Sequence, residues 1–276
     1  MSNISAADVA KLRRMTGAGM MDCKKALEEA QGDFEKAQEL IRKRGQAIAN
    51  KRADREATEG VVLAKTTADG TRGMMTALNC ETDFVAKNAD FIALSHKIID
   101  TALSSNPADL EALKETVADG KKISDLVLEN SGITGEKFEL SFFSKIEAAA
   151  VQAYIHQGNM LATLVGFNKA GIDQQVYKDV AMQVAAMNPV SVDKNDVPEK
   201  ILAQELDIAK DQARREGKPE EMLEKIAQGK LNKFFKESTL LNQEFIKDNK
   251  LTIRQYLQSK DKDLTVTGFV RFTLNT

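Results

Sequence analysis

The apolar residues of the first 45 positions recur at helical spacing in three short segments. In "ISAADVAKLRRMTG", Ser5 and Asp8 have the spacing of a capping box, and the segment stops at Gly17. The next segments, "MDCKKALEEAQG" and "DFEKAQELIRKRG", stop at Gly32 and Gly45, and glycine commonly ends a helix. We therefore predict three helices around one small core. The apolar residues expected to form that core are Val9, Leu12, Met21, Leu27, Ala30, Phe34, Leu40 and Ile41.

From Gly60 onward the apolar pattern changes to that of β-strands. The stretch "GVVLAKTTADGTRGMMTALNC" has two apolar runs around an Ala-Asp-Gly turn, which predicts a hairpin. A helical segment, "ADFIALSHKIIDTALSSNP", follows. The same order recurs in "AAVQAYIHQGNMLATLVGFN" and "VYKDVAMQVAAMNP", which also ends in Asn-Pro. Because hairpin, helix and Asn-Pro occur twice, we infer a duplicated α+β unit.

The two copies of this unit differ in length. Depending on which residues are matched, the first copy is four to seven residues longer between its hairpin and its Asn-Pro pair. We expect the additional residues to lie around "ETDFVAK", residues 81–87, in a loop that the core does not require.

A charged helical pattern separates the second copy from the last strand. Residues 198–237 carry apolar residues at spacings of three and four on both sides of Gly-Lys-Pro, which predicts an antiparallel helical hairpin. Its charged surface is either a solvated face or a surface for a partner or a second copy. The last stretch, "DLTVTGFVRFTLNT", alternates between apolar and polar residues and predicts a strand that completes a sheet begun earlier. The predicted fold class is therefore α+β.

The composition argues against several classes of function. The 276 residues are 42% hydrophobic and 29% charged, with a formal net charge of −2, which lacks the basic excess of a dedicated nucleic-acid binder. Two cysteines, Cys23 and Cys80, and two histidines, His96 and His156, are too few for a disulfide framework or a familiar metal-ligand cluster. We expect no metal, no cofactor and no direct nucleic-acid binding.

The same sequence lacks signals for membranes and for catalysis. The start, "MSNISAADVAK", has no apolar signal core, and no run approaches the length of a membrane span, so we expect a soluble, cytoplasmic protein. The stretch "TGAGMMDCKK" lacks the glycine directly before lysine that a phosphate-binding loop requires. Neither histidine lies near a nucleophile motif, and we expect a protein that is not an enzyme.

Two short stretches allow more than one interpretation. Met20 and Met21 cannot both face one small core, so they either dock the next helix or one of them forms a contact surface. In Thr82-Asp83-Phe84-Val85, Thr82 or Asp83 caps a helix and Phe84 or Val85 folds back as a staple. Alternatively, Phe84 is an exposed wedge for a partner's pocket, with Asp83 as its polar guide. The additional length of the first copy favours the wedge.

Five motifs together resemble the bacterial elongation factor Ts family, in order and over essentially the whole chain. They are "KLRRMTGAGMMDCKKALEEAQGDFEKAQELIRKRG", "NCETDFVAKNADF", "VAAMNP", "GKPEEMLEKIAQGKLNKF" and "VTGFVRF". The resemblance implies a ubiquitin-associated-like three-helix domain and two homologous core subdomains with antiparallel sheets, the second carrying an inserted helical hairpin. The boundaries that we predict are 1–56 for the three-helix domain, 57–143 for core subdomain N, 144–190 plus 238–276 for core subdomain C, and 191–237 for the hairpin.

The resemblance also implies an activity and a site. Members of this family are translation elongation factors that bind GDP-loaded elongation factor Tu and exchange its GDP for GTP without covalent chemistry. Their Thr-Asp-Phe-Val motif, here Thr82, Asp83, Phe84 and Val85, is associated with displacing Mg²⁺ from the partner. Their N-terminal domain, with Met20 and Met21 here, grips the GTPase.

Two questions stay open at the level of sequence. The complex with elongation factor Tu is either one-to-one or two-to-two, and a homodimer is an alternative assembly. A plain adaptor, whose N-terminal domain binds peptides or ubiquitin-like folds, is the alternative function.

Overall fold

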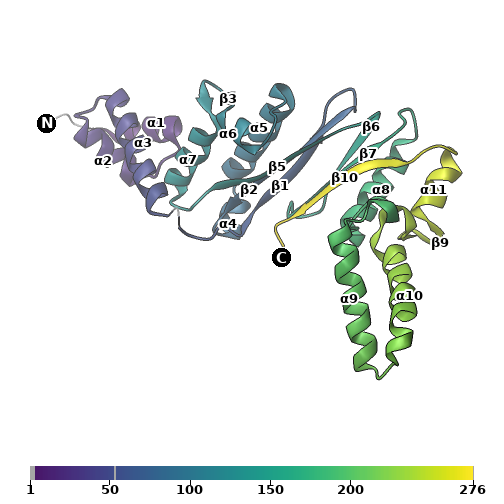
Figure 1. Cartoon of the computed structure of the whole chain (residues 1–276). Coiled ribbons are helices and arrows are strands. Elements are labelled where there is room, and N and C mark those ends of the chain that lie inside the picture. The colour runs from purple at the N-terminus through teal and green to yellow at the C-terminus, as the bar shows by residue number, and fades with distance from the viewer. Residues whose placement is uncertain (1–3, 53, 276) are drawn as a thin grey trace. The chain divides into compact units, whose positions relative to one another are not determined.

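The computed structural model describes residues 4–52 and 54–275, and Figure 1 shows the chain as a ribbon. The chain divides into two compact units. The first unit comprises the chain up to Leu63, residues 75–144 and the chain end from Leu274, and the second comprises residues 64–74 and 145–273. Helices and small sheets occur in both, which confirms the predicted α+β class. The four domain boundaries inferred from the sequence stay predictions.

The first unit opens with the three helices expected from the apolar spacing. They are α1 (Ala6–Thr16), α2 (Met20–Glu29) and α3 (Phe34–Lys51). Ser5 and Asp8 form the predicted capping box, in which each side chain accepts a hydrogen bond from the other residue's backbone N–H. The buried core of the three helices consists of Val9, Leu12, Ala18, Cys23, Ala26, Leu27, Ala30 and Ala37. Met21 was expected in this core, and that prediction is wrong because its side chain is 62% exposed.

The predicted end of the third helix at Gly45 is also wrong. Helix α3 continues to Lys51 and packs against α7 (Ile123–Thr134), where Gly45 faces Gly132. A Cβ atom added to Gly132 would lie 2.2 Å from the Cα atom of Gly45. The two backbones therefore touch at this point, and Gly45 permits close packing rather than ending the helix.

Two three-stranded sheets have the same strand order. The first consists of β1 (Glu59–Thr66), β2 (Arg72–Cys80) and β5 (Glu139–Glu147), and the second of β6 (Ala150–Ile155), β7 (Leu161–Phe167) and β10 (Val266–Thr273). In each sheet a later strand joins the second strand of the hairpin. In the second sheet both pairings are antiparallel, and Leu164 lies between Ala153 and Val270. This shared order is what a duplicated unit requires.

The helix that follows each hairpin ends in the same way. Helix α5 (Ala89–Ser105) is followed by Asn106 at φ 49°, and α8 (Gln174–Met187) by Asn188 at φ 44°. Asparagine tolerates this left-handed conformation better than most residues, and the next residue in both copies is a proline, which cannot continue a helix. The repeated Asn-Pro pair is therefore a helix stop in both copies.

Shorter elements complete both units. Those of the first unit are α4 (Asp83–Ala86), α6 (Leu110–Glu115), β3 (Val117–Ala118) and β4 (Lys121–Lys122). Those of the second are α9 (Glu199–Arg215), α10 (Glu220–Ser238), β8 (Glu244–Phe245), β9 (Asp248–Thr252), α11 (Ile253–Lys260) and the 3₁₀ turns Lys194–Asp196 and Leu240–Asn242. The core of the second unit gathers residues of β7, α8, α11 and β10, among them Phe167, Val180, Leu257 and Val266.

Helices α9 and α10 form the predicted hairpin and lie side by side in Figure 1. The chain reverses through Gly217, which has a φ of 74°. Small or apolar side chains are buried along the seam between the helices: Ala209, Ala213, Leu223, Ala227 and Leu231. The helical spacing in the sequence therefore identified both the hairpin and its contact faces.

Candidate functional site

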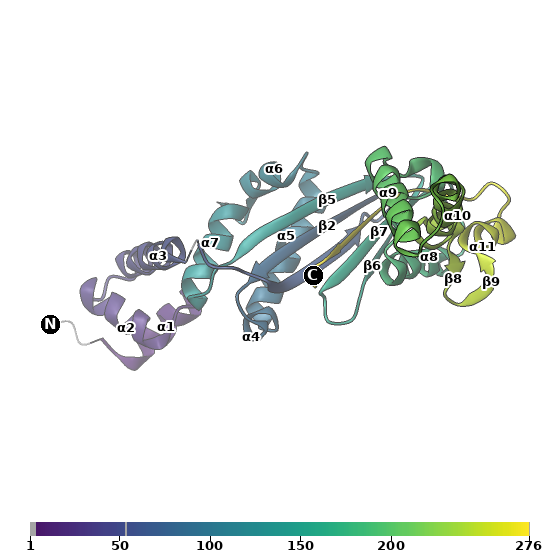
Figure 2. The same ribbon diagram turned by 60° about the horizontal axis from the view of Figure 1, so that its bottom comes forward.

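The turn that follows β2 presents an apolar ring to solvent. Phe84 is 84% exposed, the highest fraction among the exposed large apolar side chains of the described residues. It lies in α4, a helix of four residues that precedes α5 at the end of β2 (Figure 2). An aromatic ring this exposed gains nothing from its own chain's core, so the expectation of an exposed Phe84 is confirmed.

The structure shows the predicted cap of this turn, whereas the role of Phe84 as a wedge for a partner stays a prediction. Thr82 caps α4, because its hydroxyl oxygen accepts a hydrogen bond from the Val85 N–H at 3.4 Å. Val85 is half-buried and Ala86 is buried, which attaches the turn to its unit. The alternative in which Phe84 folds back as a staple is wrong. The turn is thus capped and attached while its ring faces outward.

The additional residues of the first copy are only partly in this turn. Residues 81–88 separate β2 from α5, whereas residues 168–173 separate β7 from α8. The turn is therefore two residues longer than its counterpart, and α5, with 17 residues, is three longer than α8, with 14. The expectation that all the extra length lies around residues 81–87 is corrected, since part of it lengthens the helix.

Asp83 supplies a negative charge beside the exposed ring. Its Oδ2 atom lies 2.6 Å from Nζ of Lys87, one helical turn away. The hydrogen bond that Lys87 donates lowers the pKa of the Asp83 carboxyl, so the group is ionised at neutral pH. Lys87 is largely exposed and Asp83 about half exposed, so a partner that offers a stronger cation or a hydrogen-bond donor can draw Asp83 away from Lys87.

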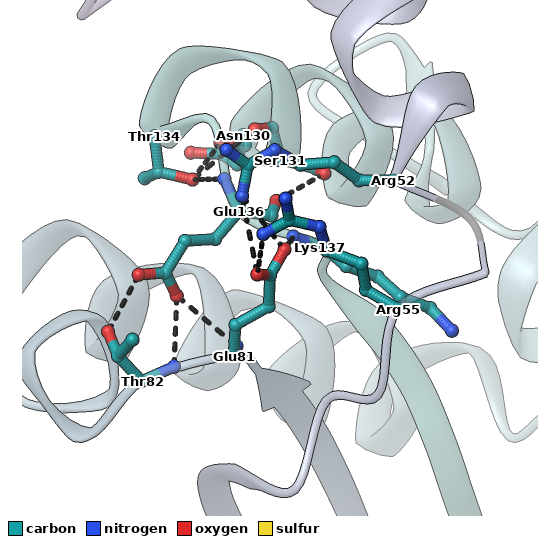
Figure 3. A network of polar contacts seen from close by, with 9 residues as sticks. All are labelled: Arg52, Arg55, Glu81, Thr82, Asn130, Ser131, Thr134, Glu136 and Lys137. Carbon is teal, nitrogen blue, oxygen red and sulfur yellow. Dashed lines mark hydrogen bonds and ion pairs between the residues drawn. The ribbon is translucent and has the colours of Figure 1, made fainter.

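Two glutamates attach the turn to the rest of the first unit (Figure 3). The carboxylate of Glu136 accepts hydrogen bonds from the Thr82 hydroxyl at 2.6 Å and from the N–H groups of Thr82 and Glu81 at 3.1 and 3.2 Å. The Glu81 carboxylate accepts a hydrogen bond from the Lys137 N–H at 2.7 Å. Each glutamate thus binds the backbone beside the other.

Two arginines complete this network. A guanidinium nitrogen of Arg52 lies 3.1 Å from one Glu81 oxygen, and one of Arg55 lies 2.9 Å from the other. Burial alone would raise the pKa of Glu81, but the hydrogen bonds from Lys137, Arg55 and Arg52 lower it to about 2. The sequence gives no sign of this network, because no motif links Glu81 to Glu136, 55 positions away.

This depressed pKa predicts an acid-dependent loss of stability. A carboxyl group with a lower pKa in the folded than in the unfolded chain stabilises the fold above its unfolded value, and the contribution disappears as pH falls through the folded value. For Glu81, with an ordinary value of 4.5 and a folded value of about 2, about 3 kcal/mol is expected to be lost across that window. Urea unfolding at pH 5, 4 and 3 measures the effect.

The control for this prediction is Glu81→Gln. The variant cannot ionise at position 81, so its free energy of unfolding should depend less steeply on pH than that of the wild type. Other carboxylates contribute equally to both proteins and cancel in the difference. Parallel pH dependences of the two proteins would show that Glu81 carries no such linkage.

The two methionines of the glycine turn are both exposed. Met20, the first residue of α2, is 42% exposed and Met21 is 62% exposed. Gly17, with a φ of 72°, ends α1, whereas Gly19 precedes α2 with an ordinary negative φ. The side chains thus stay at the surface, which agrees with the interpretation of a contact surface.

The remaining chemically active residues do not converge. Burial raises the pKa of the Cys80 thiol to about 12, and Cys23 is buried in the three-helix core. His96 is exposed in α5, and His156 is exposed in the turn after β6. Among the described residues no three His, Cys, Asp or Glu side chains are placed to hold a metal ion. No helix in the part of the chain that the structure describes has the length and apolarity of a membrane span.

Known proteins match this chain over nearly all of its length. A sequence model of the family described as Elongation factor TS matches residues 81–276, a range that includes the Thr82–Val85 turn. The chain is similar to the Elongation factor Ts of Porphyromonas gingivalis, with 56% identity over 269 residues, 97% of each chain. It is also similar to those of Amoebophilus asiaticus, with 52% identity over 97% of this chain and 98% of the relative, and of Cytophaga hutchinsonii, with 49% over the whole of both.

Proposed function

This chain belongs to the elongation factor Ts family, and we propose that it accelerates GDP release from elongation factor Tu through the exposed turn that carries Phe84. Membership makes it a translation elongation factor, and the family's activity is nucleotide exchange rather than covalent chemistry. We further propose that residues Thr82–Val85 carry out this exchange by displacing Mg²⁺ from the partner, and that the protein acts in the cytoplasm. The observation that carries it is the Phe84 ring, 84% exposed on a capped turn.

The ring supplies binding energy that only a partner can realise. Burial of a phenylalanine side chain is worth roughly 1.5–3 kcal/mol, and aromatic residues are enriched among the side chains that dominate protein interfaces. Because Phe84 forgoes this gain in its own chain, the gain is available when the ring enters a pocket of elongation factor Tu. We propose that Phe84 enters beside the nucleotide site and shifts the backbone there.

The charge beside the ring supports the same mechanism. Mg²⁺ is held by few protein ligands and by phosphate oxygens, and it neutralises the charge of the diphosphate. Ionised Asp83 competes for hydrogen-bond donors near that site, while Thr82 and Val85 hold the turn in shape. Once Mg²⁺ is displaced, the negative charges of the two phosphate groups are no longer neutralised and repel each other. GDP then dissociates faster.

Thermodynamic coupling explains how the factor both binds and leaves. If the factor weakens nucleotide binding, nucleotide weakens factor binding by the same ratio, and about 1.4 kcal/mol of coupling changes each affinity tenfold. GDP leaves when the factor binds, and the factor leaves when GTP enters. We further propose that Met20 and Met21 form a second contact with the GTPase, since both are exposed.

The test is the release of a fluorescent GDP analogue from purified elongation factor Tu. We expect release to be many-fold faster with this protein than without it, and to saturate as its concentration rises. A plain adaptor would bind elongation factor Tu without changing the release rate, and that result would refute the proposed exchange activity. The light-scattering mass of the complex distinguishes one-to-one from two-to-two assembly.

A further inference from the structure

The direction of the Phe84 ring depends on the backbone of a very short helix. The ring is 84% exposed, so few contacts of its own hold it in place. Helix α4 has four residues, far fewer than a helix needs to be stable alone in water. Side chains outside α4 must therefore hold this turn.

Glu136 makes three of the contacts at the entry to α4. Its Oε2 atom accepts from the N–H groups of Glu81 and Thr82, and its Oε1 atom accepts from the Thr82 hydroxyl at 2.6 Å. That hydroxyl oxygen in turn accepts from the Val85 N–H. A carboxylate is a stronger acceptor than a neutral group, and here it fixes the residue that caps α4.

Glu136 is itself held at the end of a well-packed helix. Gly135, with a φ of 71°, ends α7, and the Glu136 backbone carbonyl accepts a hydrogen bond from the Ser131 hydroxyl at 2.6 Å. The Glu136 N–H donates to the Thr134 hydroxyl oxygen at 3.3 Å. The position of the carboxylate is thus set by α7, which packs on α3, and not by the turn that it binds.

Glu81 provides the reciprocal contact. Its carboxylate accepts from the Lys137 N–H and is paired with Arg52 and Arg55, which follow α3. The two chain segments 81–82 and 136–137 are therefore joined in both directions (Figure 3). A turn held in this way loses little conformational entropy when it binds, which favours binding.

We infer that Glu136 is a positioning residue for nucleotide exchange, which holds the Thr82 cap so that Phe84 is presented to the partner in one orientation, with Glu81 as the second attachment. This inference rests on the proposed role of Phe84. Glu136 acts through Thr82 and does not itself touch the partner's nucleotide.

A tryptophan at position 84 tests this role by spectroscopy. The sequence contains no tryptophan, so Phe84→Trp introduces a single emitting indole at the tip of the turn. In that background, Glu136→Ala should lower the fluorescence anisotropy of the indole, because the cap loses its acceptor and the turn moves more freely. Glu136→Gln should restore most of the anisotropy, since its amide oxygen still accepts from the two N–H groups. Glu111→Ala, which removes an exposed carboxylate paired with Lys114, should leave it unchanged.

Exchange kinetics in the otherwise wild-type chain provide the second measurement. Glu136→Ala should lower the maximal rate of GDP release by about tenfold, equivalent to about 1.4 kcal/mol, with a smaller change in the half-saturating concentration, and Glu136→Gln should recover most of the rate. Undiminished indole anisotropy together with wild-type release in Glu136→Ala would overturn the inference. So would slower release accompanied by a lower melting temperature but unchanged indole anisotropy, because that pattern indicates a purely structural role. If Phe84→Ala exchanges GDP normally while Glu136→Ala still lowers the indole anisotropy, the proposed function fails rather than the positioning contact.

Discussion

Replacement of Phe84 by alanine is expected to lower the maximal rate of GDP release from elongation factor Tu by about 30-fold and to leave the melting temperature unchanged. The rate effect corresponds to about 2 kcal/mol, the loss typical of a truncated aromatic residue that dominates an interface. Stability should not change, because an 84% exposed ring contributes little to its own fold. Release of a fluorescent GDP analogue measures the first quantity, and thermal unfolding monitored by circular dichroism measures the second.

The control for Phe84→Ala is Val117→Ala. Val117 is another exposed apolar residue of the first unit, with 60% of its surface exposed. It lies in β3, outside the Thr82–Val85 turn that we propose to bind the partner. Its truncation should change neither the release rate nor the melting temperature. If Phe84→Ala lowers the melting temperature by many degrees, the ring supports the fold and the staple interpretation returns. If release is unchanged, the ring is not part of the exchange mechanism.

Gly132→Ala is expected to destabilise the first unit by about 2–3 kcal/mol, although alanine is the better helix former. Intrinsic propensity alone predicts a gain of up to about 1 kcal/mol for glycine to alanine within a helix. The new Cβ atom would lie 2.2 Å from the Cα atom of Gly45, and a backbone atom cannot move aside as a side chain can. Helices α3 and α7 would have to separate, and overpacking of this kind costs about 1–3 kcal/mol or more.

Gly229→Ala is the matched control for Gly132→Ala. Gly229 lies within α10, and nothing lies within 4 Å of the place where its Cβ atom would be. This variant should therefore gain up to about 1 kcal/mol of stability. Urea unfolding of the two variants and the wild type should show midpoints that move in opposite directions. A higher midpoint for Gly132→Ala as well would contradict the close contact of α3 with α7.

Local signals in the sequence predicted the elements of this fold well. The Ser5 and Asp8 capping box, the two hairpins and the paired helices α9 and α10 all depend on residues close to one another in the chain. The repeated order of elements, with its Asn-Pro stops, also predicted a duplication, and the two sheets share one strand order. Such signals act over one or two turns of chain, so their physical cause is present in a single segment.

The candidate site was predictable only in part. The motif placed Phe84 in a turn, and the additional length of the first copy favoured an exposed ring over a buried one. Exposure of the ring depends on whether neighbouring elements cover it, which the apolar pattern does not specify. Glu136 was missed because a lone glutamate after a helix carries no signal of its own.

The sequence by itself therefore determined the main helices and hairpins, their repeated order and the resemblance to the family, because periodicity, caps and motifs are properties of contiguous residues. Only the tertiary structure decided that Gly45 is a point of helix contact, that the Glu136 carboxylate accepts from the Glu81 N–H, and that the Glu81 carboxylate accepts from the Lys137 N–H. The partners in these contacts lie 87, 55 and 56 positions apart. The free energy of each such contact is a property of two residues that folding brings together, so it cannot be inferred from either residue's place in the sequence alone.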